Sequence, residues 1–332
     1  MTTNRIGRRA LLGAGAALLG WPGLGVGPAL AQDGSQPIRI VIPYAPGGGS
    51  DILARPILPS LSEAMGRAVI VENRGGAAGN IGAAQVARAA PDGLTLVMAN
   101  NSHTINPFLY RNVGYDMARG FEPISLVGTS PLIVVVPANV PARSIEDLVA
   151  LARARPGGLN FGSPGAGTPG HLAAALFNGL MGLNAVHVPY QGSGPTTIAL
   201  LQGEVQFSFS TPAAVEAHIR SGALRPLAVT SKARFAAFPE TPALAETGLA
   251  PLADFDVAVW WGLLAPAGTD PVFLDRMAAA VAAAIAVPRI RDTWLTQGMV
   301  PRATSRAEFR ALIATELTRW ERVVADNRIT VD

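Results

Sequence analysis

Cysteine is absent from the sequence, and lysine occurs only once, at Lys232. The absence of cysteine excludes disulfides, thiolate metal ligands and cysteine nucleophiles, so the hydrophobic core alone must hold the fold together. Four histidines are present, but they form neither an HExxH motif nor another metal-ligand spacing. A Walker motif is missing as well. We therefore expect neither a metal nor another cofactor.

An excess of one charge is also lacking once the N-terminus is set apart. Three arginines, Arg5, Arg8 and Arg9, precede a weakly apolar stretch, and Ala29-Leu30-Ala31 matches the small-x-small pattern of a signal peptidase site. We predict a signal peptide over residues 1–31 and a periplasmic location, with the paired arginines favouring twin-arginine export over a Sec signal. A membrane anchor is the alternative, but the stretch is short and broken by glycine and proline.

Residues 32–332 would carry no net formal charge, because three of the 26 basic residues leave with the signal peptide and all 23 acidic residues remain. The charged residues are scattered singly, without a basic run beside aromatic residues. Nothing therefore indicates a nucleic-acid partner. The length of this mature chain suits two domains of ordinary size.

The most informative segment runs from Ile38 to Asp51 and reads IRIVIPYAPGGGSD. Its β-branched start predicts a buried strand, its three glycines a loop, and Ser50-Asp51 the N-cap of a helix over about residues 52–65. A glycine loop ahead of a helix N-terminus exposes backbone N–H groups that bind anions. The segment holds no nucleophile or phosphate-binding lysine, so we interpret it as a binding loop. For Asp51 we favour a capping role over a ligand contact.

Strands alternate with helices along the rest of the chain, which predicts parallel, doubly wound sheets. In such sheets the ligand lies beyond the carboxyl ends of the strands, where the loops after three early strands are rich in glycine or polar residues. Two apolar runs over residues 124–137 predict a crossing to a second domain, and residues 257–265 predict the return. We expect Trp260 and Trp261 to pack at this junction rather than to stack on a ligand. Helical spacing in the last helix predicts a packing face made of Phe309, Ile313, Leu317 and Trp320.

A second glycine loop, Ser163 to Gly170, follows a predicted strand and contains a GxGxxG pattern. The next strand does not end in the acidic residue that a dinucleotide ribose requires, and Pro169 removes one amide. The loop therefore predicts a small-anion site that includes the Thr168 hydroxyl. His171 could either donate a hydrogen bond to a bound carboxylate or be satisfied by its own backbone, and the sequence favours neither.

Serine catalysis is the alternative function. Ser163 and Ser193 lie beside glycines, but neither belongs to a GxSxG motif, and no histidine–acid pair follows from their positions. Because a triad can be assembled from distant residues, an exported serine hydrolase stays open as the second hypothesis.

Seven motifs, taken together and in order, resemble one family over essentially the whole mature chain. They are IPYAPGGGSD, ENRGGAAGNIGA, APDGLTL, FGSPGAGTPGHLAA, VPYQGSGP, FPETPALAETGL and WWGLLAPAGT. They are similar to the Bug/TctC-like extracytoplasmic solute receptors of tripartite tricarboxylate transporters. The resemblance implies an α/β protein of the type II periplasmic-binding-protein fold, with two doubly wound α/β lobes joined by two crossings. Lobe 1 would comprise residues 32–132 and 256–332, and lobe 2 residues 133–255.

The function that this resemblance implies is a receptor, not an enzyme. A small carboxylate (a di- or tricarboxylate or an aromatic carboxylate) would bind between the lobes of a monomer. The closed form would dock on the membrane subunits of the transporter, unless the chain is an orphan receptor or a sensor input. Relatives often carry an aspartate after a phenylalanine where this chain has Phe209-Ser210. The loss of that acid points away from amino acids and toward simple or aromatic carboxylates.

The resemblance also implies which residues bind the ligand, largely through backbone amides and hydroxyls. They are Tyr44, Gly47, Gly48, Ser50, Asp51 and Asn80 on lobe 1, and Ser163, Gly167, Thr168, His171, Tyr190 and Ser210 on lobe 2.

Overall fold

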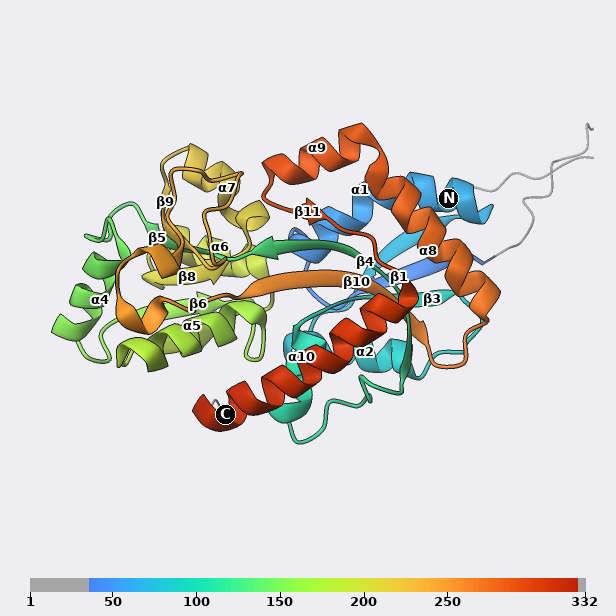
Figure 1. Ribbon diagram of the computed structural model, residues 1–332, viewed down its shortest axis with the longest axis horizontal. Helices are drawn as coiled ribbons and strands as arrows, with labels where there is room; N and C mark the ends of the chain where they lie inside the picture. Colours follow the sequence, from blue (N-terminus) through green and yellow to red (C-terminus); the bar gives the residue numbers. More distant parts are fainter. Residues whose placement is uncertain (1–35, 328–332) are drawn as a thin grey trace, which may run out of the picture. The chain divides into compact units, whose positions relative to one another are not determined.

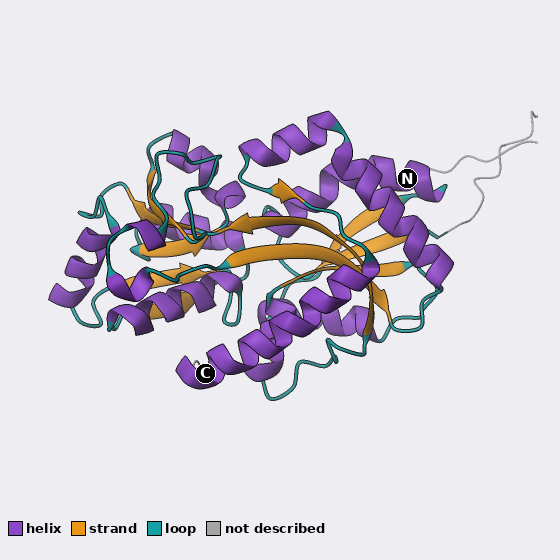
Figure 2. Cartoon of the chain, viewed as in Figure 1, coloured by secondary structure: helices purple, strands orange, loops and turns teal. Residues whose placement is uncertain are grey.

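The computed structural model describes residues 36–327, so the predicted signal peptide and its cleavage site lie outside the described residues. Two sheets, each flanked by helices, organise this part of the chain (Figures 1 and 2). We call the first sheet and its helices lobe 1, and the second sheet and its helices lobe 2.

The sheet of lobe 1 has the strand order β11-β4-β10-β3-β1-β2. Strand β1 pairs in parallel with β2 and β3, as the sequence predicts, but β10, β4 and β11 each run antiparallel to the preceding strand in the order β3-β10-β4-β11. The strands are β1 (Ile38–Ile42), β2 (Val69–Asn73), β3 (Thr95–Asn100), β4 (Phe121–Pro131), β10 (Ala258–Pro266) and β11 (Val300–Pro301). The helices are α1 (Gly49–Met65), α2 (Asn80–Ala87), α3 (Ser102–Ile105), α8 (Pro271–Ala286), α9 (Pro288–Thr296) and α10 (Arg306–Asn327), with 3-10 turns η1 (Ala77–Gly79) and η2 (Asn106–Phe108).

The sheet of lobe 2 repeats this plan with the order β7-β6-β8-β5-β9. Strands β6, β7 and β8 are parallel, while β5 is antiparallel to both β8 and β9. The strands are β5 (Ile133–Pro137), β6 (Asn160–Ser163), β7 (Val186–Pro189), β8 (Phe207–Ser210) and β9 (Leu224–Val229). The helices are α4 (Ile145–Ala154), α5 (Pro169–Met181), α6 (Ser193–Gln202) and α7 (Pro212–Arg220), with 3-10 turns η3 (Leu244–Glu246) and η4 (Ala250–Leu252). A wholly parallel sheet is therefore wrong for both lobes, because the strands next to the crossings run against the others.

Two crossings join the lobes, and one buried threonine ties them together. The first is Leu132, between β4 and β5, and the second is Val257, where the chain leaves the turns η3 and η4 of lobe 2 and enters β10. The Thr230 hydroxyl donates to the Val257 carbonyl at 2.6 Å and accepts from the Leu132 N–H at 2.8 Å. The Thr230 N–H donates to the Leu132 carbonyl at 2.9 Å. The crossings therefore form one hydrogen-bonded unit rather than two independent strands.

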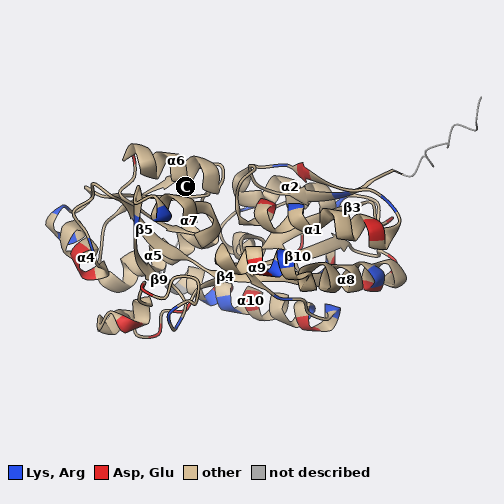
Figure 3. Ribbon diagram, turned by 90° about the horizontal axis from the view of Figure 1, so that it is seen from above, with Lys and Arg blue, Asp and Glu red and all other residues tan. Residues whose placement is uncertain are grey.

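Positions of acidic and basic residues are scattered along the ribbon of both lobes in Figure 3, as the sequence predicts. Within residues 36–327 no single helix is long and apolar enough to cross a membrane, and only α8 and α9 together, which are bent by 70° at their junction, meet that test.

Helix α10 packs on lobe 1 as its spacing predicts, because Phe309, Ile313 and Trp320 are buried. A buried carboxylate anchors the helix. Glu316 Oε2 accepts hydrogen bonds from Asn101 Nδ2 at 2.8 Å, from the Trp320 indole at 2.9 Å and from the Trp260 indole at 3.3 Å. Three donors from three segments thus share one acceptor.

Glu316→Ala is expected to lower the free energy of unfolding by about 3 kcal/mol, because buried donors lose their acceptor at about 1–3 kcal/mol each. Urea denaturation measures the change. Glu321→Ala, at an exposed position of the same helix, is the control and should cost less than about 0.5 kcal/mol. Equal losses in the two variants would show that the carboxylate does not anchor α10.

Candidate functional site

One pocket lies where the N-termini of four helices meet. Its empty space, mouth included, is about 500 Å³, which limits any ligand to a small molecule. Gly49 and Ser50 begin α1, Thr168 caps α5, Ser193 begins α6, and Thr211 precedes α7 at the N-cap position without a side-chain hydrogen bond to it. The full lining is Ile42, Tyr44, Ala45, Gly48, Gly49, Ser50, Asp51, Asn100, Leu132, Pro164, Thr168, Pro169, Gly170, Ser193, Phe209, Thr211, Val259 and Trp261.

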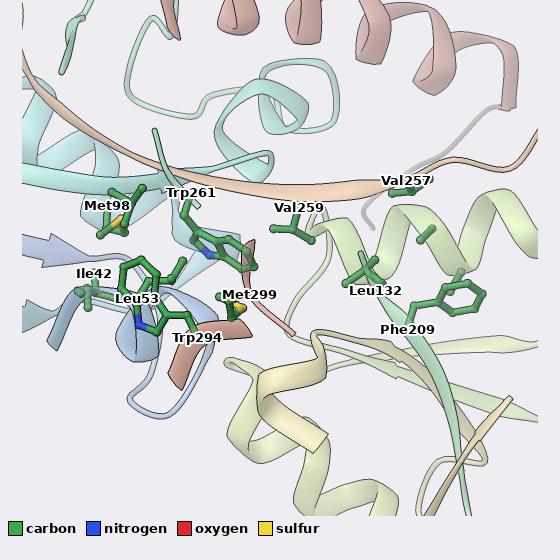
Figure 4. Close-up of a cluster of buried hydrophobic side chains, with 14 of the residues drawn as sticks. Ile42, Leu53, Met98, Leu132, Phe209, Val257, Val259, Trp261, Trp294 and Met299 are labelled. Atoms are coloured by element: carbon green, nitrogen blue, oxygen red, sulfur yellow. The ribbon is translucent and has the colours of Figure 1, made fainter. Parts of the chain in front are cut away.

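The wall of the pocket is apolar and continuous with the core. Trp261, Val259, Leu132 and Phe209 belong to the large buried cluster of Figure 4, in which Trp261 lies near Leu53. These four side chains come from β10, the first crossing and β8, so both lobes contribute. The expectation that Trp261 only packs at the junction is therefore incomplete, since its ring also faces the pocket. Trp260 does pack, edge-on against Phe309 at 5.5 Å between ring centroids.

Helix α1 starts earlier than the sequence predicts. Gly48 is its N-cap and has no side chain to cap with, whereas Ser50 and Asp51 lie within the first turn. The N–H groups of Gly49 and Ser50 find no acceptor among the described residues. Glycine is required at position 49 because an added Cβ would lie 2.6 Å from Cζ2 of Trp261. The α1 terminus therefore presents open N–H donors beneath an aromatic ring.

The Asp51 carboxylate holds the first loop. Its carboxylate accepts from Arg55 Nε at 2.8 Å and Nη2 at 2.9 Å, from the Gly47 N–H at 3.2 Å and from Asn73 Nδ2 at 3.2 Å. Burial raises the pKa of the carboxyl, but these hydrogen bonds outweigh it and hold the pKa below its ordinary value. Among the residues that the structure describes, Asp51 is the only charged residue in the lining, and Arg55 neutralises it.

The second loop is held by its own side chains. Thr168 caps α5, and its hydroxyl also donates to the Gly165 carbonyl at 2.7 Å. Nδ1 of His171 accepts from the Gly167 N–H at 3.1 Å, so His171 is satisfied by its own backbone, which was one of the two alternatives. Burial lowers the pKa of His171 to about 4, so the ring is neutral at pH 7.

Beneath this loop Ser163 contacts His187, but Ser163 lacks the surroundings of a catalytic nucleophile. Ser163 Oγ lies 2.6 Å from His187 Nε2, yet Ser163 is fully buried and outside the lining of the pocket. His187 stacks on His171 at 4.0 Å and on Phe161 at 4.9 Å, and no acidic side chain pairs with it among the described residues. Burial, with a smaller contribution from His171, lowers the pKa of His187 to about 3, which makes it a poor general base at neutral pH.

Tyr44 separates the pocket from a second cavity. Its hydroxyl donates to Ser102 Oγ at 2.8 Å and lies within hydrogen-bond distance of Asn100 Oδ1 and the Ala78 carbonyl. Burial raises the pKa of the phenol to about 12. The second cavity, with about 320 Å³ of empty space, lies between Tyr44, the loop of residues 76–79 and Tyr190.

The structure brings together five of the predicted ligand residues, which line the pocket: Tyr44, Gly48, Ser50, Asp51 and Thr168. Seven do not line it: Gly47, Asn80, Ser163, Gly167, His171, Tyr190 and Ser210. Asn80 is the first residue of α2, and Ser210 Oγ pairs with Ser208 Oγ at 3.0 Å.

Three polar residues of the lining were not among the predicted ligand residues. Asn100 ends β3, Ser193 was weighed only as a nucleophile, and Thr211 follows the end of β8. The signal that could have found Asn100 and Thr211 is the rule that ligands lie beyond the carboxyl ends of parallel strands. Within residues 36–327, no group of three or more histidine, aspartate or glutamate side chains is placed to hold a metal ion.

Two α/β lobes, two crossings and a pocket between the lobes define the class: this is a type II periplasmic-binding-protein fold. Solved proteins share it. The periplasmic binding protein BugD superposes with a TM-score of 0.85 at 29% identity, covering 89% of this chain and 98% of that chain. An R. palustris protein solved with adipate gives a TM-score of 0.85 at 32% identity, covering 90% and 99%. MatC of Rhodopseudomonas palustris, solved with bound malate, gives 0.82 at 27% identity, covering 86% and 98%.

Sequence comparison identifies the family. The profile described as "Tripartite tricarboxylate transporter family receptor" matches residues 53–329. BugT of Bordetella pertussis is 34% identical over 294 residues, which cover 88% of this chain and 89% of that protein. A UPF0065 protein from the tcbD–tcbE intergenic region of a Pseudomonas species is 35% identical over 98% of this chain and 96% of that protein. The chain therefore belongs to the tripartite tricarboxylate transporter receptor family, which confirms the resemblance in its motifs.

Proposed function

We propose that this protein is a periplasmic receptor that binds a small carboxylate between its lobes and presents it to the membrane subunits of a tripartite tricarboxylate transporter. The observation that carries the proposal is the meeting of four helix N-termini in a pocket whose one charged side chain is already neutralised. Helix N-termini attract anions through their exposed N–H groups and their dipoles. The related proteins solved with adipate and malate support the same ligand class.

Backbone donors must share the binding energy. One helix N-terminus contributes about 0.3–2 kcal/mol, while micromolar affinity requires about 8 kcal/mol. We expect the remaining binding free energy to come from several groups acting together. They are four helix N-termini, burial of the ligand against Trp261, and the hydroxyls of Ser50, Ser193 and Thr168. Selectivity then depends on shape and on the placement of hydrogen bonds more than on net charge.

The chemistry of the lining favours a carboxylate without an ammonium group. Asp51 is occupied by Arg55, and Ser210 stands where relatives often have an acid, so the described lining offers no free carboxylate to an amine. We therefore expect simple or aromatic carboxylates to bind more tightly than aspartate or glutamate.

Isothermal titration calorimetry with adipate, malate, benzoate, aspartate and glutamate tests the proposal. Native mass spectrometry of protein purified from its own periplasm shows which acid is retained. Micromolar binding of at least one carboxylate is the expected result. Tighter binding of the amino acids would refute the predicted selectivity, and turnover of an ester panel that is lost in Ser193→Ala would favour the hydrolase instead.

Closure of the lobes about the two crossings would complete the site. With the predicted division into lobe 1 (residues 32–132 and 256–332) and lobe 2 (residues 133–255), the hinge would lie at the two boundaries, where Thr230 bonds both Leu132 and Val257. Small-angle scattering of the protein, expected to be a monomer, should show a smaller radius of gyration with saturating ligand. An unchanged radius would contradict closure on binding.

Arg55→Gln is expected to weaken carboxylate binding by about ten-fold, because the Asp51 carboxylate then faces the pocket with its charge uncompensated. Calorimetry on the carboxylate that binds the wild-type protein measures the change. The double variant Asp51→Asn/Arg55→Gln removes both charges and should recover part of the affinity. If the double variant binds no better than the single one, repulsion is not the cause.

A further inference from the structure

The two lobes contact each other at two places beside the pocket. On one side, residues 192–194 lie against the first loop: an added Cβ on Gly192 would be 3.3 Å from Cβ of Ala45. On the other side, the second glycine loop lies against the segments of lobe 1 that follow β2 and α3.

A side chain of lobe 1 donates directly to the second loop. The Tyr110 hydroxyl donates to the Ala166 carbonyl at 2.7 Å. Tyr110 follows η2 in lobe 1, and Ala166 lies between Ser163 and Thr168 in lobe 2. Because Thr168, two residues further on, lines the pocket, this hydrogen bond fixes a ligand-facing segment from the opposite lobe.

Close backbone approach completes the contact. Gly167 has φ +87°, and an added Cβ there would overlap Oδ1 of Asn106, a buried oxygen without a hydrogen-bond partner in the described part of the chain. Gly165 has φ +142°, and an added Cβ would lie 3.7 Å from Cα of Ala78. The two glycines thus let the loop touch lobe 1 with backbone alone.

The surface that lobe 1 offers is strained. Four consecutive residues from Gly76 to Gly79 have positive φ, and two of them are alanines, with φ 46° at Ala77 and 53° at Ala78. A positive φ raises the conformational free energy of an alanine, so this conformation persists only where contacts with the surrounding structure hold it. Here the Ala78 carbonyl accepts from Asn106 Nδ2 at 3.2 Å, so the same asparagine holds the strained turn and faces Gly167.

We propose that Tyr110 and Gly167 are positioning residues that hold the lobes closed over the pocket. Opening the lobes breaks the Tyr110–Ala166 hydrogen bond and separates Gly167 from Asn106, while the contacts within each lobe stay intact. The contact therefore lowers the free energy of the closed form relative to the open one. If the pocket binds a carboxylate, as proposed above, the interlobe contact should slow the release of that ligand.

The test compares two tyrosine variants in a background that contains no native cysteine. Glu63→Cys and Glu146→Cys, at exposed positions of α1 and α4, carry spin labels that report the distance between the lobes. Tyr110→Phe is expected to lower the closed-to-open ratio about three- to ten-fold, the effect of one hydrogen bond. Tyr115→Phe is the matched control, because the Tyr115 hydroxyl bonds only within lobe 1, to Asn80 Oδ1 at 3.1 Å and the His103 carbonyl at 3.4 Å.

A second pair of variants tests the backbone contact. Gly167→Ala and Gly203→Ala introduce the same strain, since the φ of Gly203 is +77°, but nothing lies within 4 Å of a Cβ at position 203. Only Gly167→Ala should shift the distance distribution toward the open form. The proposal is overturned if Tyr110→Phe matches Tyr115→Phe and Gly167→Ala matches Gly203→Ala.

Kinetics separate this proposal from the proposed function. With adipate or malate as the probe, stopped-flow measurements should show release faster by about three- to ten-fold in Tyr110→Phe, with association changed by less than about two-fold. If neither acid binds the wild-type protein, the receptor function for these ligands fails, while the lobe distances without ligand still decide the role of Tyr110. Equal release rates in Tyr110→Phe and Tyr115→Phe would overturn the proposal.

Discussion

Gly49→Ala is expected to weaken carboxylate binding roughly 10- to 200-fold, the range that one misplaced methylene produces in a tight pocket. The added Cβ would lie 2.6 Å from Cζ2 of Trp261, a ring that is buried and cannot rotate away freely. The ring must therefore move, either into the pocket or against Leu53 and the core. The same overpacking should lower the free energy of unfolding by about 1–3 kcal/mol. Calorimetry and urea denaturation measure the two effects.

Gly48→Ala is the matched control for stability. Gly48 has φ −85°, which alanine adopts readily, and the nearest atom to an added Cβ is Ser193 Oγ at 3.6 Å, an ordinary contact. Because Gly48 is the N-cap of α1 and alanine caps less well than glycine, its cost should be about 0.5–1 kcal/mol, without the overpacking that Gly49→Ala adds. Should the two neighbouring substitutions destabilise the protein equally, the close approach of Trp261 to the start of α1 does not constrain this position.

Acid is expected to destabilise the protein through three buried histidines. Burial lowers the pKa of His103 to about 4, of His171 to about 4 and of His187 to about 3. In the unfolded chain the same rings take up protons near pH 6.5. Because each folded-state pKa is depressed, the unfolded state binds more protons between these values. The stability that the neutral rings provide is therefore complete above about pH 6.5 and is lost as the pH falls toward 4.

The expected loss is roughly 2 kcal/mol for each histidine on going from pH 7.5 to pH 5, a large part of the stability of an ordinary domain. Urea denaturation at the two pH values measures it. His103→Asn should lower stability at pH 7.5, since Nδ1 of His103 accepts from the Asn100 N–H at 3.1 Å, but should reduce the pH-dependent loss by about one third. Identical stability at pH 5 and pH 7.5 would mean that these rings are not held neutral.

Local sequence patterns predict most elements of the fold. The β-branched run before the first glycines forms β1, and the apolar spacing around Phe309 forms the buried face of α10. The direction of β10 and β4 could not be predicted, because an apolar strand buried on both faces has the same composition in a parallel or an antiparallel ladder. The start of α1 was placed too late because Gly48, which has no side chain, caps it in place of Ser50.

The site was predictable where a short segment forms it and not where distant segments meet. Gly48, Ser50 and Thr168 follow from a strand, a glycine loop and a helix start, and all three line the pocket. Trp261 can line the pocket because Gly49, more than 200 residues earlier in the chain, leaves room for its ring. No local sequence pattern indicates that these two residues are in contact. The Asn106 contact to Gly167 joins different lobes in the same way, and only the three-dimensional structure shows it.

The position of Trp261 gives the protein an intrinsic fluorescent probe of its pocket. Trp261 lines the pocket, whereas Trp260, Trp294 and Trp320, although equally buried, do not. A metabolite that enters would alter the polarity around one fluorophore and leave the others unchanged. Emission spectra could therefore screen a library of acids without any dye, and Trp261→Phe would remove the signal.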